Sequence, residues 1–171
     1  MRKLDALVSF FIKDCNFTAA ENDKPYFIID EFLPSGNYVD NGFNTGICAY
    51  DQVYTAVINF ERFPHKRYSL DYVLSRLTEW IFANDPIIYR KRIATGSDNE
   101  LIDLEPPDVN IDPDLLDDET AQLEIQVQFR EPVFWVLDAN GAFDYDGNKW
   151  RLADAGVSAE QFERNYIINR S

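Results

Sequence analysis

The largest group of side chains that could do chemistry is a run of carboxylates between Arg92 and Arg130, a stretch with no Lys or Arg. Two carboxyl groups that face one pocket, with their pKa values pushed apart, can act as an acid and base pair in hydrolysis. A run of ten carboxylates singles out no such pair. The ten residues are Asp98, Glu100, Asp103, Glu105, Asp108, Asp112, Asp114, Asp117, Asp118 and Glu119.

Three prolines, Pro106, Pro107 and Pro113, interrupt this acidic stretch and disfavour regular helix or strand there. We therefore predict a long acidic loop at residues 95–119. The simplest interpretation is a solvated loop, and the functional alternative is a loop that docks a partner or lines a charged surface. A short strand fits within it, near residues 101–104 or 109–111. A small hydrolase that uses some of these acids remains open, and it requires a concave pocket where they converge.

A second group of oxygen-bearing side chains lies near the C-terminus and could suggest calcium. A helix-loop-helix calcium loop needs Gly at its sixth position and Glu at its twelfth, and no starting point in this segment provides both. Two hairpin turns explain the same residues better, because Asn, Asp and Gly are typical of such turns. The residues are Asp138, Asn140, Asp144, Asp146 and Asn148.

The remaining reactive side chains form no catalytic pattern. His65 is the only histidine, and its position between a strand and a helix indicates a surface loop. Cys15 and Cys48 lack the spacing of a metal cage or a disulfide framework, so we expect two reduced core residues. The glycines follow no phosphate-binding pattern. We therefore expect no catalytic residue, no metal and no cofactor, and a protein that is not an enzyme.

The composition indicates a folded, acidic protein. The chain has 171 residues, 46% of them hydrophobic, with 30 acidic and 16 basic residues and a net charge of -14. We expect one domain over residues 1–171, because a chain this long can bury about two thirds of its unfolded surface. The charge disfavours binding to nucleic acid phosphates or anionic lipid. The start resembles no secretory signal and no segment is long enough to span a membrane, so we expect a cytoplasmic origin.

Basic residues are dense at only two places, residues 66–67 and 90–92. Both groups are too short for a nucleic-acid-binding face in so acidic a chain. We expect Arg90, Lys91 and Arg92 to contact acidic surface on another copy or a partner. Trp135 is a further candidate for a subunit contact, because Trp side chains often anchor interfaces.

The elements that must position these residues begin with a helix and two strands. Apolar residues at three- and four-residue steps predict a helix over residues 3–14 that docks on the core. Aromatic and β-branched residues predict a strand over 24–33, ended by turn residues at 34–37. A strand over 47–60 is apolar on both faces at its end, which indicates a central position in the sheet.

The second half of the chain predicts one more helix and several antiparallel strands. Ser69 can cap a helix that ends before Asp85 and Pro86. Its expected core positions are Leu70, Val73, Leu74, Leu77, Trp80, Ile81 and Ala83.

Strict alternation predicts a strand over residues 121–130, and Pro132 indicates an edge position or a kink before the strand restarts at 133–137. A C-terminal region at about 133–169 is expected to hold a hairpin and a short helix capped by Ser158. This arrangement predicts an α+β fold, with an antiparallel sheet.

Four segments together resemble a known family in their order and spacing. They are residues 3–7 (KLDAL), residues 54–60 (YTAVINF), the helix that contains Leu74 and Trp80, and residues 123–133 (LEIQVQFREPV). This pattern resembles the tail completion protein R family of contractile-tailed temperate phages, over about residues 1–137.

The resemblance implies a tail terminator-like fold, with helices packed on one face of the sheet. It also implies a structural role, completing the tail at its head-proximal end as a homo-oligomeric ring, expected to be a hexamer. The implied partners are the tail tube, the sheath and the head-tail connector, with DNA only passing through the lumen. The implied location is the virion tail, after synthesis in the bacterial host cytoplasm. The family has no catalytic residues to carry over. In such a ring, we expect part of the acidic loop of this chain to face the lumen or a connector protein.

One functional alternative depends on charge alone. An acidic protein can imitate DNA or act as an immunity-type inhibitor of a basic enzyme, because complementary charge speeds encounter and blocks phosphate-binding grooves. Such a protein would remain monomeric or dimeric and would be recovered with a basic nuclease.

Overall fold

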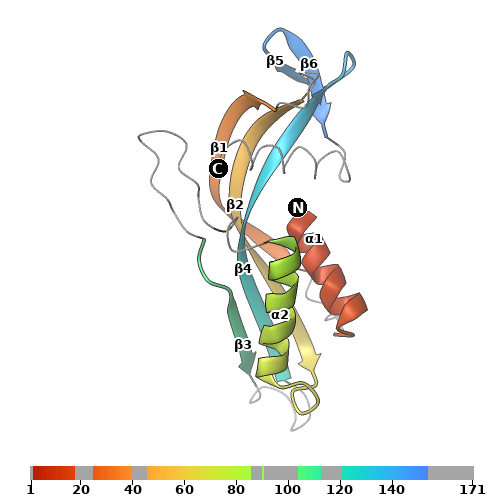
Figure 1. The fold of residues 1–171 in the computed structure, drawn as a ribbon, viewed down its shortest axis with the longest axis vertical. Coiled ribbons are helices and arrows are strands. Elements are labelled where there is room, and N and C mark those ends of the chain that lie inside the picture. Colours follow the sequence, from red (N-terminus) through yellow and green to blue (C-terminus); the bar gives the residue numbers. More distant parts are fainter. Residues whose placement is uncertain are drawn as a thin grey trace. The chain divides into compact units, whose positions relative to one another are not determined.

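The computed structural model describes residues 2–17, 25–39, 46–85, 90, 104–112 and 121–153. Its elements are α1 (Arg2–Ser9), a π-helical turn η1 (Phe10–Asp14), β1 (Tyr26–Tyr38), β2 (Gly46–Phe63), α2 (Leu70–Asn84), β3 (Asp108–Asp112), β4 (Ala121–Leu137), β5 (Phe143–Tyr145) and β6 (Asn148–Leu152) (Figure 1). The predicted α+β class is confirmed.

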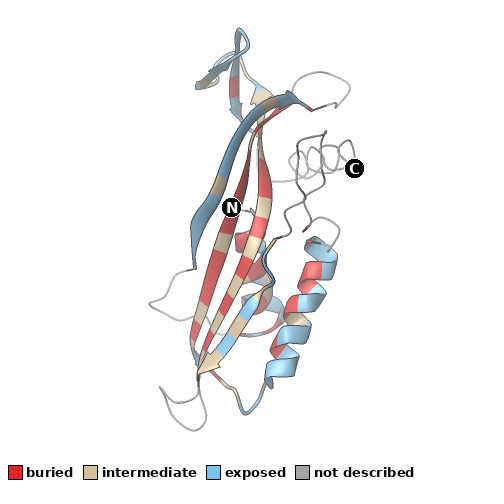
Figure 2. Cartoon of the chain, turned by 90° about the vertical axis from the view of Figure 1, so that its left-hand side faces the viewer, coloured by how far each residue is buried: buried red, intermediate tan, exposed pale blue. Residues whose placement is uncertain are grey.

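The strands form one antiparallel sheet in the order β1-β2-β4-β6-β5, and β3 also pairs with β4. The long strands β2 and β4 are its centre. The predicted central position of the second strand is confirmed, since β2 lies between β1 and β4 and most of its residues are buried. β1 lies at one end of the strand order and exposes most of its residues, as Figure 2 shows.

The described part of the chain divides into two compact units. Of the described residues, the first contains 2–17, 25–28, 54–85, 90, 104–112 and 121–129, and the second contains 29–39, 46–53 and 130–153. Each unit has its own apolar cluster.

In the first unit, both helices cover the same face of the sheet. Alternate residues of β2 and β4 point to this face, among them Tyr54 and Phe129, and they pack with the apolar stripes of α1 and α2. The Phe129 ring lies 5.8 Å from that of Tyr54 and 5.7 Å from that of Trp80. Full burial of a side chain of this size contributes about 2–3 kcal/mol, so this layer supplies much of the unit's stability.

Helix α2 begins and ends where the sequence predicts, but it buries fewer residues. The Ser69 hydroxyl accepts a hydrogen bond from the backbone N–H of Tyr72 at 3.1 Å, which caps the first turn. The expected core positions Leu70, Leu74 and Ala83 are wrong, because these side chains are exposed. The buried strip consists of Val73, Leu77, Trp80 and Ile81. A helix on a sheet buries only the side that faces it.

The predicted end of the first strand at residues 34–37 is also wrong, since β1 continues to Tyr38. Pro34 cannot donate a backbone hydrogen bond, and an edge strand tolerates such a residue. The Ser35 hydroxyl instead donates to the carbonyl of Cys48 at 2.9 Å, which holds β1 against β2. The turn residues therefore lie inside a strand because the strand is at an edge.

Strand β4 passes through Pro132 without interruption. On the side of β4 away from β2, the described pairings are with β3 at residues 122–126 and with β6 at 135–137, and Pro132 lies in the interval. The burial alternation changes phase there, because Glu131 and Pro132 are both buried. The expected irregularity is thus a phase change within one strand.

The second unit contains a small apolar cluster of Val39, Cys48 and Phe134, and a separately buried Trp150. The predicted hairpin joins β5 to β6 through Asp146 and Gly147, whose φ angles are 52° and 74°. A two-residue turn with both φ angles positive matches the twist of the strands. The predicted hairpin turn at residues 144–148 is therefore confirmed. Residues 138–141 form a turn, in which the N–H of Gly141 donates to the carbonyl of Asp138 at 2.8 Å, but not a hairpin, because among the described strands both β4 and β5 pair with β6.

Two predictions fall partly outside the described residues. The acidic stretch at 95–119 contains β3, which confirms the short strand near 109–111. The other described part of that stretch, residues 104–107, has no regular structure. The expected helix after Ser158 lies outside the described residues. Among the described helices, neither is both long and apolar enough to cross a bilayer.

Candidate assembly surfaces

The structure describes three of the ten acidic candidates. Glu105 and Asp108 are exposed and Asp112 is half-buried, all in or just before β3. The other seven, Asp98, Glu100, Asp103, Asp114, Asp117, Asp118 and Glu119, lie outside the described residues, as do Lys91 and Arg92.

The register between β3 and β4 places carboxylates opposite carboxamides. Asp108 lies opposite Gln126, and Asp112 lies opposite Gln122. Between them, the amide Asn110 lies opposite the carboxylate Glu124. Directly opposed residues share a face, so these side chains and that of Gln128 form one surface, which we call the polar face. Its residues are Asp108, Asn110, Asp112, Gln122, Glu124, Gln126 and Gln128.

The intervening residues point to the helix-covered side. Val109 lies opposite Ile125 and Ile111 lies opposite Leu123, and all four pack in the core of the first unit. The polar face is therefore the side of the sheet away from α1 and α2. The alternation predicted for residues 121–130 already indicated a wet face, but only the β3 register shows which side chains join it.

The polar face is acidic and locally hydrogen-bonded. The Gln126 amide donates to the Glu124 carboxylate at 2.7 Å, and the Gln128 side-chain oxygen accepts from the backbone N–H of Glu105 at 2.8 Å. Residues 104–112 and 121–129 contain no Lys or Arg. A surface of carboxylates and amides without cations repels phosphate groups and gives them no ion-pair partner.

Within the described residues, no group of His, Cys, Asp and Glu side chains has the spacing of a metal site. The carboxylates of the polar face alternate with amides along two strands, so they do not converge on one point.

The candidate contact residue Arg90 lies inside the subunit. It is buried and donates to the Asp85 carboxylate at 2.7 Å and to the Glu105 carbonyl at 3.1 Å. Trp135, the other described candidate, is half-buried and its ring stacks on that of Phe143, with centroids 4.7 Å apart. Neither side chain projects freely from the surface.

The sequence analysis did not predict an exposed apolar surface on β1. Seven large side chains of this strand are 44–56% exposed: Tyr26, Phe27, Ile28, Ile29, Phe32, Leu33 and Tyr38. The missed signal is the absence of alternation at residues 26–29, which are apolar at every position. Such a run is typical of a strand buried on both faces. Here the strand instead leaves side chains on both faces about half exposed (Figure 2).

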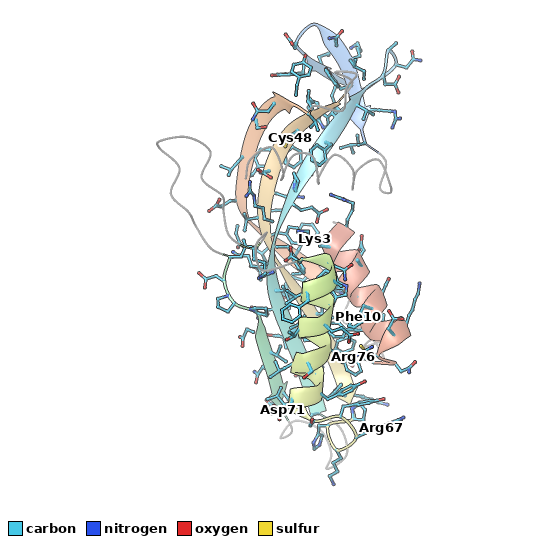
Figure 3. All side chains as sticks on the ribbon, viewed as in Figure 1. Lys3, Phe10, Cys48, Arg67, Asp71 and Arg76 are labelled. Carbon is cyan, nitrogen blue, oxygen red and sulfur yellow. The ribbon has the colours of Figure 1, made fainter. Side chains whose placement is uncertain are left out.

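Helix α2 has a shallow depression on its outer side. Leu74, Thr78 and Phe82 line it, with Asp71 and Glu79 among its other residues. On another side of the helix, Arg76 contacts the π-helical turn η1 and the residue after it. Its guanidinium lies 4.9 Å from the centre of the Phe10 ring (Figure 3). It also donates to Cys15 Sγ at 3.2 Å. The free thiol Cys15 is buried, as predicted, and so is Cys48.

The comparisons with known proteins agree with the resemblance seen in the sequence. Residues 1–154 match the family P2 phage tail completion protein R (GpR). The chain is similar to a protein of Haemophilus phage HP1, named an uncharacterized 19.2 kDa protein in the rep-hol intergenic region, with 28% identity over 111 residues. That match covers 64% of this chain and 59% of the relative, so the chain spans less than two thirds of the relative's length. No solved structure matches the chain.

Proposed function

Since the chain belongs to the P2 phage tail completion protein R family, we propose that it is a structural protein of the phage tail. In this proposal it acts as a homo-oligomeric ring at the head-proximal end of the tail. Its partners there are the tail tube, the sheath and the head-tail connector. The protein is made in the host cytoplasm and ends in the virion.

We further propose that the polar face lines the passage through which DNA moves. The observation that carries this proposal is the β3–β4 register, which places each carboxylate of Asp108, Asp112 and Glu124 opposite an amide, on the side of the sheet that faces away from α1 and α2. DNA carries a dense row of negative charges, and contacts with Lys or Arg would hold it in place. An acidic lining without cations lets DNA pass without binding. We extend this proposal to the acidic residues between 98 and 119 that lie outside the described residues, which would line the same passage.

The tail role is tested by deleting the gene from the phage and supplying it in trans. We expect the deletion to abolish infectious particles and to leave tails that fail to join heads, as seen by electron microscopy. Finished, head-joined tails in the absence of the protein would refute the tail role.

The lining is tested by reversing its charge in the complementing protein. We expect the triple variant Asp108→Lys, Asp112→Lys, Glu124→Lys to let virions assemble but to lower DNA delivery, because each new ammonium group can bind a phosphate. DNA release from purified virions and infectious titre are the readouts.

A matched control makes the same change in charge elsewhere. Asp14, Asp71 and Asp144 are exposed carboxylates outside the polar face, so the variant Asp14→Lys, Asp71→Lys, Asp144→Lys should release DNA at the normal rate. Equal release by the two triple variants would refute the lining while leaving the tail role intact.

A further inference from the structure

The apolar surface of β1 has the properties of a sheet edge that another strand covers. β1 ends the strand order, so among the described strands β2 alone pairs with it. Its exposed residues occupy both faces, with Tyr26 and Ile28 on one side and Phe27 on the other. Proteins normally protect an exposed edge with charges, Pro or bulges. Residues 26–29 contain no charged residue and no Pro.

The size of this surface fits a protein partner. At roughly 200 Å² for each complete side chain, the seven exposed residues of β1 leave about 700 Å² uncovered. A stable protein interface takes about 800 Å² from each partner. The whole strand therefore exposes nearly the area that one side of such an interface needs, and residues 26–28 account for about 300 Å² of it.

The first unit of the same chain offers a complementary edge. Among the described strands, β3 pairs only with β4 and so ends the sheet on that side. Its residues Val109 and Ile111 face the helix-covered core and remain only partly buried. Phe27 points to the same side of the sheet, since its ring lies 6.0 Å from that of the core residue Tyr54. Joining the two edges would place apolar side chains of one copy beside those of the next.

Charge favours this pairing over the pairing of two β1 strands. Residues 26–28 bear no charge, so they can lie beside the carboxylates of Asp108 and Asp112 without like-charge repulsion. A parallel, in-register pairing of two β1 strands would place Asp30 beside Asp30 and Glu31 beside Glu31. The apolar start of β1 is therefore better matched to β3.

We infer that residues 26–28 of β1 pair with the outer edge of β3 in a second copy of this chain. This inference rests on the proposed homo-oligomeric ring. The contact joins two different surfaces, so each copy has a free edge for the next, and a closed ring results when the rotation between copies closes. The same sides of the two sheets then align from copy to copy, because Ile28 lies on the side of the sheet that carries Asn110 and the polar face.

The first test changes the apolar edge of the full-length protein and measures mass by light scattering. Ile28, 55% exposed, is replaced in Ile28→Lys, and Phe82 on α2, 61% exposed, is replaced in the control Phe82→Lys. We expect wild type and Phe82→Lys to be oligomeric and Ile28→Lys to be monomeric, with unchanged circular dichroism. A monomeric wild type, or an Ile28→Lys oligomer of wild-type mass, would overturn the inference.

The second test identifies the partner edge by disulfide cross-linking. Under mild oxidation, the double variant Ile28→Cys, Asn110→Cys should form a ladder of linked multimers on a non-reducing gel, and each single variant should stay unlinked. A linked dimer of Ile28→Cys alone would show β1 pairing with β1 and would refute the β3 contact.

The two proposals fail in different experiments. If Ile28→Lys keeps its mass and the deletion phage lacks finished tails, only the edge contact is wrong. If Ile28→Lys is monomeric and the deletion phage still finishes its tails, only the tail role is wrong.

Discussion

Asp85 and Arg90 form an ion pair of 2.7 Å in which the side chains are only 1% and 10% exposed. Lys3, at the start of α1, also donates to the Asp85 carboxylate, at 2.8 Å. Arg90 continues to the carbonyl of Glu105, and the N–H of Leu104 donates back to the Arg90 carbonyl at 3.0 Å. One carboxylate at the end of α2 thus connects the first helix with the segment that enters β3.

Removing this carboxylate charge should strongly destabilise the protein. Asp85→Asn keeps the side-chain shape but leaves two cations in a buried site without their shared carboxylate. Breaking a buried ion pair on one side costs about 3–5 kcal/mol. The free energy of unfolding from urea titrations measures the loss.

The control for this prediction is an exposed pair. Asp144 and Lys149 are 2.7 Å apart, with side chains 75% and 51% exposed. Asp144→Asn should cost about 0–1 kcal/mol, because water screens both charges. Similar losses for the two variants would contradict a structural role for the buried pair.

Truncating Phe129 tests the packing of the sheet against the helices. Its side chain is fully buried between the rings of Tyr54 and Trp80. Phe129→Ala should cost about 3–5 kcal/mol, since the loss of buried area is joined by a cavity. Phe82→Ala, on the exposed side of α2, should change the free energy of unfolding of the monomer little. Denaturant unfolding at low protein concentration makes the comparison.

Two glycines in the hairpin region should differ in their tolerance of a methyl group. At Gly141 a Cβ would overlap backbone atoms of Trp150, so the backbone itself must shift. Gly147 has a positive φ of 74° but nothing within 4 Å of its Cβ position. Gly147→Ala should cost about 1–2 kcal/mol from the backbone alone, and Gly141→Ala about 3 kcal/mol. The midpoint of thermal unfolding measures the loss of stability in each variant. A larger loss for Gly147→Ala than for Gly141→Ala would contradict the described turn.

The Cys15 thiol should respond to Arg76. Burial raises the pKa of Cys15, and the hydrogen bond and positive charge of Arg76 partly oppose this rise. Arg76→Leu should therefore raise the pKa of Cys15 further. Glu79→Gln is the control, and it should lower the pKa slightly because the Glu79 charge favours the protonated thiol. The rate of alkylation against pH, in a Cys48→Ala background, reports the shift.

The same pKa determines the direction of a stability change with pH. The folded state holds the Cys15 proton more tightly than the unfolded state does, so this contribution is complete below the ordinary pKa of a thiol. It is lost as the pH rises through the higher pKa of the folded state. Cys15→Ala should therefore reduce the loss of stability at alkaline pH. An identical alkaline loss in both proteins would contradict this prediction.

Local patterns were sufficient to predict most of the elements. Helix α2 was predicted from the Ser69 cap and from apolar residues at helical spacing, and β4 from strict alternation, because both signals depend on neighbours within a few residues. The hairpin at Asp146 and Gly147 was predicted for the same reason. The end of β1 and the exposure of Leu70 and Leu74 were not predicted, because they depend on which strand edge and which helix face has a neighbour in the fold.

The amino-acid sequence by itself determined the acidity of this protein, its α+β class and the elements from which it is built, because charge and periodicity are properties of the chain. Only the tertiary structure decided which side chains meet. It placed Arg90 inside against Asp85, although basic residues are usually exposed, and it aligned Asp108, Asn110 and Asp112 with the amides and carboxylate of β4. The β3–β4 pairing and the contact of Lys3 with Asp85 join residues far apart along the chain, so no local pattern could predict either of them.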